Sequence, residues 1–283
     1  MATVLETLNK SYQDLLSHNI STAKLDSEVI LASVLKTNRI NLITKQNLNL
    51  NTRQQNLYTS LITRRKKNEP VAYILNTKDF WNESYYVDKR VLIPRPETEV
   101  LIEMLLRKIK NKDKTFHILD IGCGSGCLLI SSLKELGKSF GLGVDISSSA
   151  LKVAKINIQK HNLNNRAKLL KANLFTIKIR KKFNIIFSNP PYLARSEYEN
   201  LSSDIKKYEP KKALIGGATG IEFYKTIIDF SKKSLKENGF LALEIGDGQY
   251  NEIVKILTSH SFREIDKLKL VNGEIRCILA TKV

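Results

Sequence analysis

The chain has 283 residues, 42% of them hydrophobic, which is enough for one large domain with a sizeable core and a smaller second domain. Lys and Arg number 46 against 28 Asp and Glu, giving a net charge of +18. A polyanionic partner is compatible with this balance, but a general compositional bias towards Lys, Asn and Ile explains it as well. No apolar run approaches the roughly 20 residues that span a bilayer, and no secretory signal pattern opens the chain. We therefore expect a cytoplasmic protein without a membrane segment.

The first part of the chain, residues 1–72, is predicted to form a small helical domain. Apolar residues recur there at three- and four-residue steps in three stretches. The third stretch ends in four cations at residues 64–67, which suit the dipole of a last helical turn. We interpret this run as a capped, solvated helix end, with a basic binding surface as the alternative. Pro70 is expected to end the helical structure.

Residues 73–93 are predicted to form a β-hairpin that links the two domains. β-branched and aromatic residues gather around this segment in short runs that are separated by breakers. The runs are 71–74, 85–87 and 91–93.

Residues 94–283 alternate between short apolar runs and helical patterns. This alternation predicts a Rossmann-like α/β fold, with a parallel sheet and helices on both faces. Asn272-Gly273 is a strong hairpin turn signal, so we expect an antiparallel edge at the C-terminal end. The predicted strands are 116–121, 142–145, 167–171, 183–188, 239–245, 262–270 and 274–281, and the predicted helices are 98–108, 127–136, 148–161 and 221–237.

A glycine-rich loop, Asp120-Ile-Gly-Cys-Gly-Ser-Gly126, follows the first of these strands and opens a helix. Glycines allow a sharp turn and a close approach of a ligand, and the helix amides supply hydrogen-bond donors. Asp145 ends the next strand, where a carboxylate can accept hydrogen bonds from the two hydroxyls of a ribose. The pattern indicates a nucleoside-containing ligand, with a purely structural glycine turn as the alternative.

The third glycine of a dinucleotide loop is missing, because Cys127 stands at its position. The loop instead resembles the Asp-x-Gly-x-Gly-x-Gly signature of class I methyltransferases, which bind S-adenosylmethionine. An NAD-like ligand remains the alternative. Cys123, Cys127 and Cys277 predict neither a disulfide framework nor a zinc site, so we expect no metal and small apolar packing for all three.

The tetrapeptide Asn189-Pro190-Pro191-Tyr192 follows the strand at 183–188, at the carboxyl end of the sheet where ligands bind. An amide nitrogen is a poor nucleophile, because its lone pair is delocalised. The Asn189 side-chain oxygen and the Pro190 carbonyl can accept hydrogen bonds from its two N–H groups and leave one face of the nitrogen free for attack. The prolines stiffen the turn, and Tyr192 can stack on the flat group. A glutamine amide and an adenine amino group fit equally well.

The chain resembles the release-factor glutamine N5-methyltransferases along nearly its whole length. The most discriminating block is Ile-Pro-Arg-Pro-Glu-Thr-Glu at 93–99, because many nucleic-acid amino-methyltransferases share only the later motifs. The other shared segments are 69–74, 79–81, 120–126, 143–147, 188–192, 208–210 and 243–246.

The resemblance implies an N-terminal helical domain for substrate recognition (1–72), a linking hairpin (73–93) and a catalytic domain (94–283). It implies S-adenosylmethionine as cofactor and the glutamine of the Gly-Gly-Gln loop in peptide-chain release factors as substrate. No stable nucleic-acid partner is expected, and we expect a monomer. The alternatives are methylation of an adenine amino group in nucleic acid and a donor-binding protein without catalysis.

By this resemblance, each site residue has an expected role. Leu174 would lie against the adenine, although relatives often carry an acidic residue and an aromatic where this chain has Asn173 and Leu174. Glu244 is interpreted as a buried strand-end carboxylate outside the site. The expected cofactor contacts are Gly122, Cys123, Gly124, Ser125, Gly126, Asp145, Leu174 and Asn189; the expected substrate contacts are Asn189, Pro190, Pro191 and Tyr192, with Asn189 and Pro190 catalytic.

Overall fold

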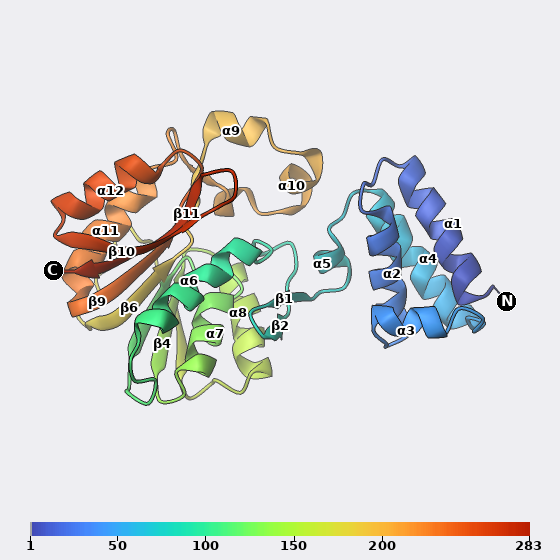
Figure 1. Ribbon diagram of the computed structural model, residues 1–283, viewed down its shortest axis with the longest axis horizontal. Helices are drawn as coiled ribbons and strands as arrows, with labels where there is room; N and C mark the ends of the chain where they lie inside the picture. The colour runs from blue at the N-terminus through green and yellow to red at the C-terminus, as the bar shows by residue number, and fades with distance from the viewer. Residues whose placement is uncertain (1) are drawn as a thin grey trace. The chain divides into compact units, whose positions relative to one another are not determined.

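The computed structural model describes residues 2–283, which divide into two compact units at Thr77 and Lys78. The first unit consists of helices α1 to α5, and the second contains the sheet (Figure 1). No helix in the described part of the chain is both long and apolar enough to cross a membrane.

The N-terminal unit is helical, as its periodicity predicts. Hydrogen bonds between side chains and backbone begin two of its long helices, because Thr3 with Glu6 and Asn51 with Gln54 each form a capping box. Apolar residues from these helices, among them Leu15 and Ile30, form a separate core. The helices are α1 (Val4–Ser17), α2 (Ala23–Val34), α3 (Arg39–Thr44), α4 (Thr52–Lys66) and α5 (Val71–Ile74).

The cations at the end of α4 form ion pairs within this unit. Arg65 Nε lies 2.7 Å from Asp26 Oδ2, and the two side chains are only 13% and 10% exposed. Lys66 lies 2.9 Å from Asp14, and Arg64 lies 2.5 Å from Glu69. The interpretation of this run as a solvated helix end is therefore wrong for Arg65, which joins α4 to α2.

The segment predicted as a linking hairpin differs in part from the prediction. β1 (Lys78–Phe80) and β2 (Glu83–Tyr85) do form an antiparallel pair, with Lys78 opposite Tyr85. The run at 71–74 is helix α5 instead of a strand, since Pro70 begins this helix and its carbonyl accepts from Ile74 N at 3.0 Å. Residues 91–93 form no strand, and Ile93 N donates to the Glu209 side chain.

The second unit contains a seven-stranded sheet in the order β10-β11-β9-β6-β3-β4-β5. The five strands from β9 to β5 in this order are parallel, whereas β11 is antiparallel to both β9 and β10. The predicted parallel sheet and its antiparallel hairpin edge are thus confirmed. The strands are β3 (His117–Ile121), β4 (Phe140–Asp145), β5 (Ala167–Lys171), β6 (Phe183–Ser188), β9 (Leu235–Glu244), β10 (Phe262–Lys269) and β11 (Ile275–Lys282).

Helices cover both faces of this sheet (Figure 1). Alternate strand residues point to opposite faces, so Ile185 and Phe187 pack with one set of helices and Ile186 with the other. One set is α6 (Pro96–Lys108), α7 (Cys127–Glu135) and α8 (Ser148–Lys160); the other is α11 (Glu222–Ser234) and α12 (Tyr250–Ser259). Helix α12 was not predicted.

A structured insertion that the sequence did not predict joins β6 to α11. Its two short strands pair in parallel, with Leu193 opposite Ile215. The insertion brings residues 210–213 and Ile215 to a cavity that Asn189, Pro190 and Pro191 of the tetrapeptide also line. Its elements are β7 (Leu193–Ala194), α9 (Arg195–Glu199), α10 (Ser203–Tyr208), the 3-10 helix η1 (Lys211–Ala213) and β8 (Ile215–Gly217).

Candidate active site

The two motif-bearing loops leave the sheet from adjacent strands. Ile121, the last residue of β3, is the register partner of Ser188, the last residue of β6. The Ser188 hydroxyl also donates to the Ile121 carbonyl at 2.9 Å. The first loop glycine, Gly122, and the first residue of the tetrapeptide, Asn189, each come one residue later, so the fold places the two motifs side by side.

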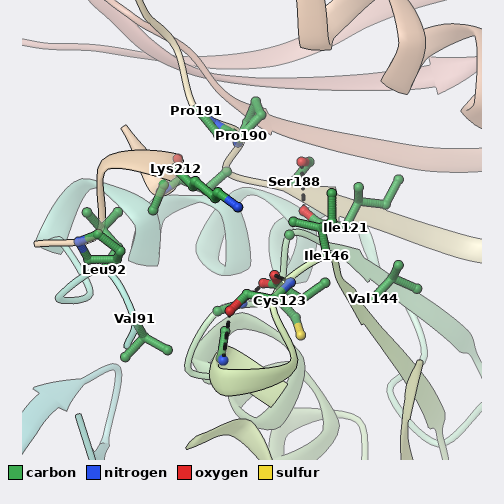
Figure 2. Close-up of a pocket in the computed structure, with 18 of the residues that line it drawn as sticks. Val91, Leu92, Ile121, Cys123, Val144, Ile146, Ser188, Pro190, Pro191 and Lys212 are labelled. Carbon is green, nitrogen blue, oxygen red and sulfur yellow. Dashed lines mark hydrogen bonds between the residues drawn. The ribbon is translucent and has the colours of Figure 1, made fainter. Parts of the chain in front are cut away.

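A cavity of about 1120 Å³ lies between these loops. Cys123, Ser188, Pro190 and Pro191 line it from the sheet side, and Lys212 reaches into it from the insertion (Figure 2). Two predicted site residues, Gly126 and Tyr192, do not line this cavity. Of the residues expected in the site, the cavity is lined by Gly122, Cys123, Gly124, Ser125, Asp145, Leu174, Asn189, Pro190 and Pro191.

The glycine loop requires glycine for its backbone conformation. Gly122, Gly124 and Gly126 have φ values of 73°, 53° and 80°, which residues with a Cβ rarely adopt. The Gly122 and Cys123 amides both donate to the Val144 carbonyl of the neighbouring strand. The loop is therefore fixed as a tight turn whose backbone lines the cavity.

Asp145 connects the glycine loop to the end of β4. Its Oδ2 accepts from Gly124 N at 3.0 Å, and its Oδ1 accepts from Ser147 N at 2.8 Å. Burial raises the pKa of this carboxyl, and the backbone hydrogen bonds oppose the rise. Because a carboxylate oxygen can accept more than one hydrogen bond, Asp145 can also bind hydroxyl groups of a ligand.

Asp120 is a second acidic group of the cavity, in addition to the predicted site residues. Its side chain is buried, and its Oδ2 has no hydrogen-bond partner within residues 2–283. Burial, and to a smaller extent the nearby Asp145 charge, raises the pKa of Asp120 to about 7. A cationic group of a ligand would stabilise the charged form of this buried carboxyl group.

An apolar wall lies beyond Asp145. Ile146, which is 56% exposed, lines the cavity together with Leu174 and Phe175. The Asn173 side-chain oxygen accepts from Phe175 N at 3.0 Å, so it turns back on its own loop. Phe175 also makes an edge contact with Phe223, with ring centroids 5.2 Å apart. The wall therefore suits a flat, apolar ring.

The Asn189 side chain is held by a carboxylate. Its Nδ2 donates to Glu244 Oε2 at 2.8 Å and faces Thr98 Oγ1 at 3.2 Å, and the Thr98 hydroxyl donates to Glu244. Within residues 2–283 no hydrogen bond occupies Asn189 Oδ1, which leaves it as an acceptor at the cavity. Glu244 is thus a buried, paired carboxylate at the end of β9, as predicted; it does not line the cavity itself but contacts Asn189, which does.

Tyr192 is held by Arg276 and Gln249. Its hydroxyl accepts from Arg276 Nη2 at 2.8 Å, and the guanidinium lies 5.0 Å from the ring centroid. Its carbonyl accepts from Gln249 Nε2 at 2.8 Å. Burial and the Glu244 charge raise the pKa of Tyr192 to about 12, so the phenol stays neutral. The ring packs on Arg276, which anchors the end of the tetrapeptide.

The Pro-Arg-Pro-Glu block joins two walls of the cavity. Arg95 Nη2 lies 2.5 Å from Glu209 Oε1, and the Glu209 side chain is only 2% exposed. Glu209 Oε2 also accepts from Ile93 N. The walls formed by Val91, Leu92 and Pro94 and by the insertion after Glu209 are thus tied together by an ion pair whose carboxylate is buried.

Family models match two parts of the chain. The PrmC N-terminal domain matches residues 6–75, and the methyltransferase small domain matches residues 97–207. A release factor glutamine methyltransferase from Clostridium botulinum is 37% identical over 279 residues, which is 98% of each chain. One from Clostridium acetobutylicum is 38% identical over 281 residues, covering 99% of this chain and 98% of the relative.

Two solved structures share the fold at low sequence identity. The hMettl16 catalytic domain, in complex with MAT2A 3'UTR hairpin 6, has a TM-score of 0.58, 17% identity and 83% coverage of each chain. A methyltransferase from Pyrococcus furiosus has a TM-score of 0.53 and 20% identity, with 79% of this chain and 96% of that chain covered.

The fold and the loops at the carboxyl end of its sheet are those of a class I methyltransferase. Enzymes of this class in general take their methyl group from S-adenosylmethionine. The full-length similarity to curated relatives narrows the assignment, and the chain belongs to the release factor glutamine methyltransferase family.

Asp120 predicts a pH-dependent stability of the ligand-free protein. Its folded-state pKa of about 7 lies above the value of about 3.9 for an unfolded chain. The stability associated with the neutral carboxyl is therefore full below about pH 4 and is lost as the pH rises through about 7. Asp120→Asn removes the charge, so it should melt on the order of 5 °C higher than the wild type at pH 8, with a smaller difference at pH 5.

Thermal unfolding by circular dichroism at both pH values measures this difference. Asp113→Asn is the matched control, because the Asp113 side chain is 85% exposed. A shift for Asp120→Asn that is the same at pH 5 and pH 8 would contradict the raised pKa.

Proposed function

We propose that this protein transfers the methyl group of S-adenosylmethionine to the side-chain amide nitrogen of the glutamine in the Gly-Gly-Gln motif of peptide-chain release factors. The observation that carries the proposal is the unoccupied acceptor atom Asn189 Oδ1, fixed beside the glycine loop by Glu244 and Thr98. The names of the full-length relatives support the protein substrate. A release factor as substrate also supports an enzyme that acts in the cytoplasm, and we propose that it acts as a monomer.

The residues of the cavity fit the methyl donor. Asp145 offers carboxylate oxygens to the ribose hydroxyls, and the wall around Ile146 and Leu174 suits the adenine ring. The unpartnered carboxylate oxygen of Asp120 suits the ammonium of the amino-acid end. Lys212, which reaches into the cavity, suits the carboxylate of that end (Figure 2).

The tetrapeptide fits a planar NH2 group as acceptor. When bound, the donor supplies an electrophilic methyl group on a sulfonium. Asn189 Oδ1 and the Pro190 carbonyl accept hydrogen bonds from the two N–H groups of the target amide. These bonds turn the target nitrogen towards that methyl group. Both oxygens also stabilise the positive charge that develops on the nitrogen as it attacks. The ion pair between Arg95 and the buried Glu209 ties two walls of the cavity together.

Methylation of an adenine amino group in nucleic acid is the weaker alternative. The cations at 64–66 that favoured it are paired with Glu69, Asp26 and Asp14. These pairs lie within the N-terminal unit and account for three of the four cations at 64–67. Parallel incubations with labelled methyl donor and either a release factor or RNA and DNA discriminate the two substrates.

Asn189→Ala is expected to abolish turnover while the donor remains bound. The substitution removes the acceptor that orients the target nitrogen, and misorientation by about 1 Å costs on the order of 100-fold in rate. Mass spectrometry of the release-factor peptide that contains Gly-Gly-Gln measures the product. Asn200→Ala, an exposed position in the insertion, is the control. A near-normal rate for Asn189→Ala would disprove the assignment of this tetrapeptide to the target amide.

Asp145→Ala should weaken binding of S-adenosylmethionine, because the ribose loses a charged acceptor. Charge-assisted hydrogen bonds of this kind are worth roughly 2–3 kcal/mol, which corresponds to about 30- to 150-fold in affinity. Titration calorimetry measures the change, with Asp113→Ala as the exposed control. An unchanged affinity would remove Asp145 from the donor site.

The N-terminal unit should contribute selectivity for the protein substrate and little to donor binding. All residues that line the cavity belong to the second unit, which begins at Lys78. A truncated protein, residues 78–283, should therefore bind the donor with an affinity close to that of the full chain and methylate an intact release factor poorly. Calorimetry and the peptide assay measure the two properties. Full activity of the truncated protein would refute this division.

A further inference from the structure

The orientation of the Asn189 amide matters for the proposed reaction. An amide side chain keeps nearly the same shape when it turns by 180°, but its donor and acceptor then exchange places. With Oδ1 towards the cavity, Asn189 accepts from a target NH2. With Nδ2 towards the cavity, the Asn189 NH2 group would face the target NH2 group. Both groups are donors, so no hydrogen bond would hold the target. Something in the protein must select the first orientation.

Glu244 is placed to make this selection. It ends β9, is 1% exposed, and accepts from Asn189 Nδ2 at 2.8 Å. The Thr98 hydroxyl donates to the same oxygen, and Arg276 Nη2 lies 3.9 Å from the other one. Burial raises the pKa of Glu244, whereas the Thr98 hydroxyl and the Arg276 guanidinium oppose the rise, and the ionised form only accepts hydrogen bonds. A turned Asn189 would set its own oxygen against this buried carboxylate, which is costly.

We propose that Glu244 is a positioning residue that acts through Asn189, by keeping Nδ2 in the protein and Oδ1 at the nitrogen to be methylated. The inference rests on the proposed function, because it specifies the acceptor half of that site. It assigns no contact between Glu244 and the substrate. Arg276 supports the arrangement from β11, since it lies between the carboxylate and the Tyr192 hydroxyl.

A double variant in which the amide at position 189 and the carboxylate at position 244 change places tests the proposal. Asn189→Asp retains acceptor oxygens but places a second carboxylate against Glu244, so kcat should fall about 100-fold or more. In the double variant, Glu244→Gln is added to Asn189→Asp. The amide at position 244 can then donate to the carboxylate at position 189 and turn its own oxygen towards Arg276. The double variant should therefore recover at least about 10-fold in kcat over Asn189→Asp, whereas residues with independent structural roles would give additive losses.

Glu244→Gln alone gives a second measurement. An amide can accept from or donate to Asn189, so it no longer dictates one orientation, and kcat should fall about 10-fold with little change in KM. Glu237→Gln is the matched control, because it lies on the same strand with a side chain that is 72% exposed. The same Glu244→Gln change in an Asn189→Ala background should give no recovery.

The measurements use the full-length protein, labelled S-adenosylmethionine and a peptide-chain release factor, with donor affinity by calorimetry for every variant. Donor affinity within about 3-fold of the wild type shows that a variant is folded. A double variant no more active than Asn189→Asp, with both binding the donor, overturns the positioning role. If Asn189→Asp does not fold, the Glu244→Gln single variant tests the proposal, and a kcat equal to that of the wild type for this variant overturns it. A wild-type enzyme that leaves the glutamine unmodified refutes the proposed function instead.

Discussion

The pairing of β3 with β6 is the constraint on which the site depends. β3 is an interior strand of the sheet, from which the chain first proceeds to one edge through β4 and β5 and then returns to the other side of β3 as β6. At such a reversal the loops at the carboxyl ends diverge and leave a crevice. The register that sets Ile121 opposite Ser188 brings the glycine loop and the tetrapeptide, 67 residues apart, to one crevice.

Most of the second unit could be predicted because its signals are local. Each buried strand is a short apolar run, and the Asn272-Gly273 turn specifies the final hairpin. The failures depend on distant or ambiguous interactions. The run at 71–74 is too short to separate strand from helix, and Pro70 suits the start of a helix. Ile93 gives its N–H to Glu209, 116 positions away, which no local pattern reveals.

The candidate site divides in the same way. The loop glycines, Asp145 and the tetrapeptide stand in short motifs that carry their own chemistry. Asp120 opens one of these motifs, so its part in the cavity could have been inferred from position alone. Glu244 had no such signal: it comes next to Asn189 only because β6 and β9 are neighbours, with Ser188 opposite Leu243. Without knowledge of the partner strand, the sequence does not indicate which side chain a strand-end carboxylate contacts.

Two prolines alone do not preorganise the acceptor turn. Proline fixes its own backbone φ, but it does not orient the side chain of the preceding asparagine. Contacts from three other elements complete the turn: Glu244 from β9, Gln249 before α12 and Arg276 from β11. The insertion also packs closely, since a Cβ at Gly216 would lie 2.5 Å from the Pro191 carbonyl. The antiparallel hairpin thus does more than extend the sheet, because Arg276 holds both the Glu244 carboxylate and the ring that ends the tetrapeptide.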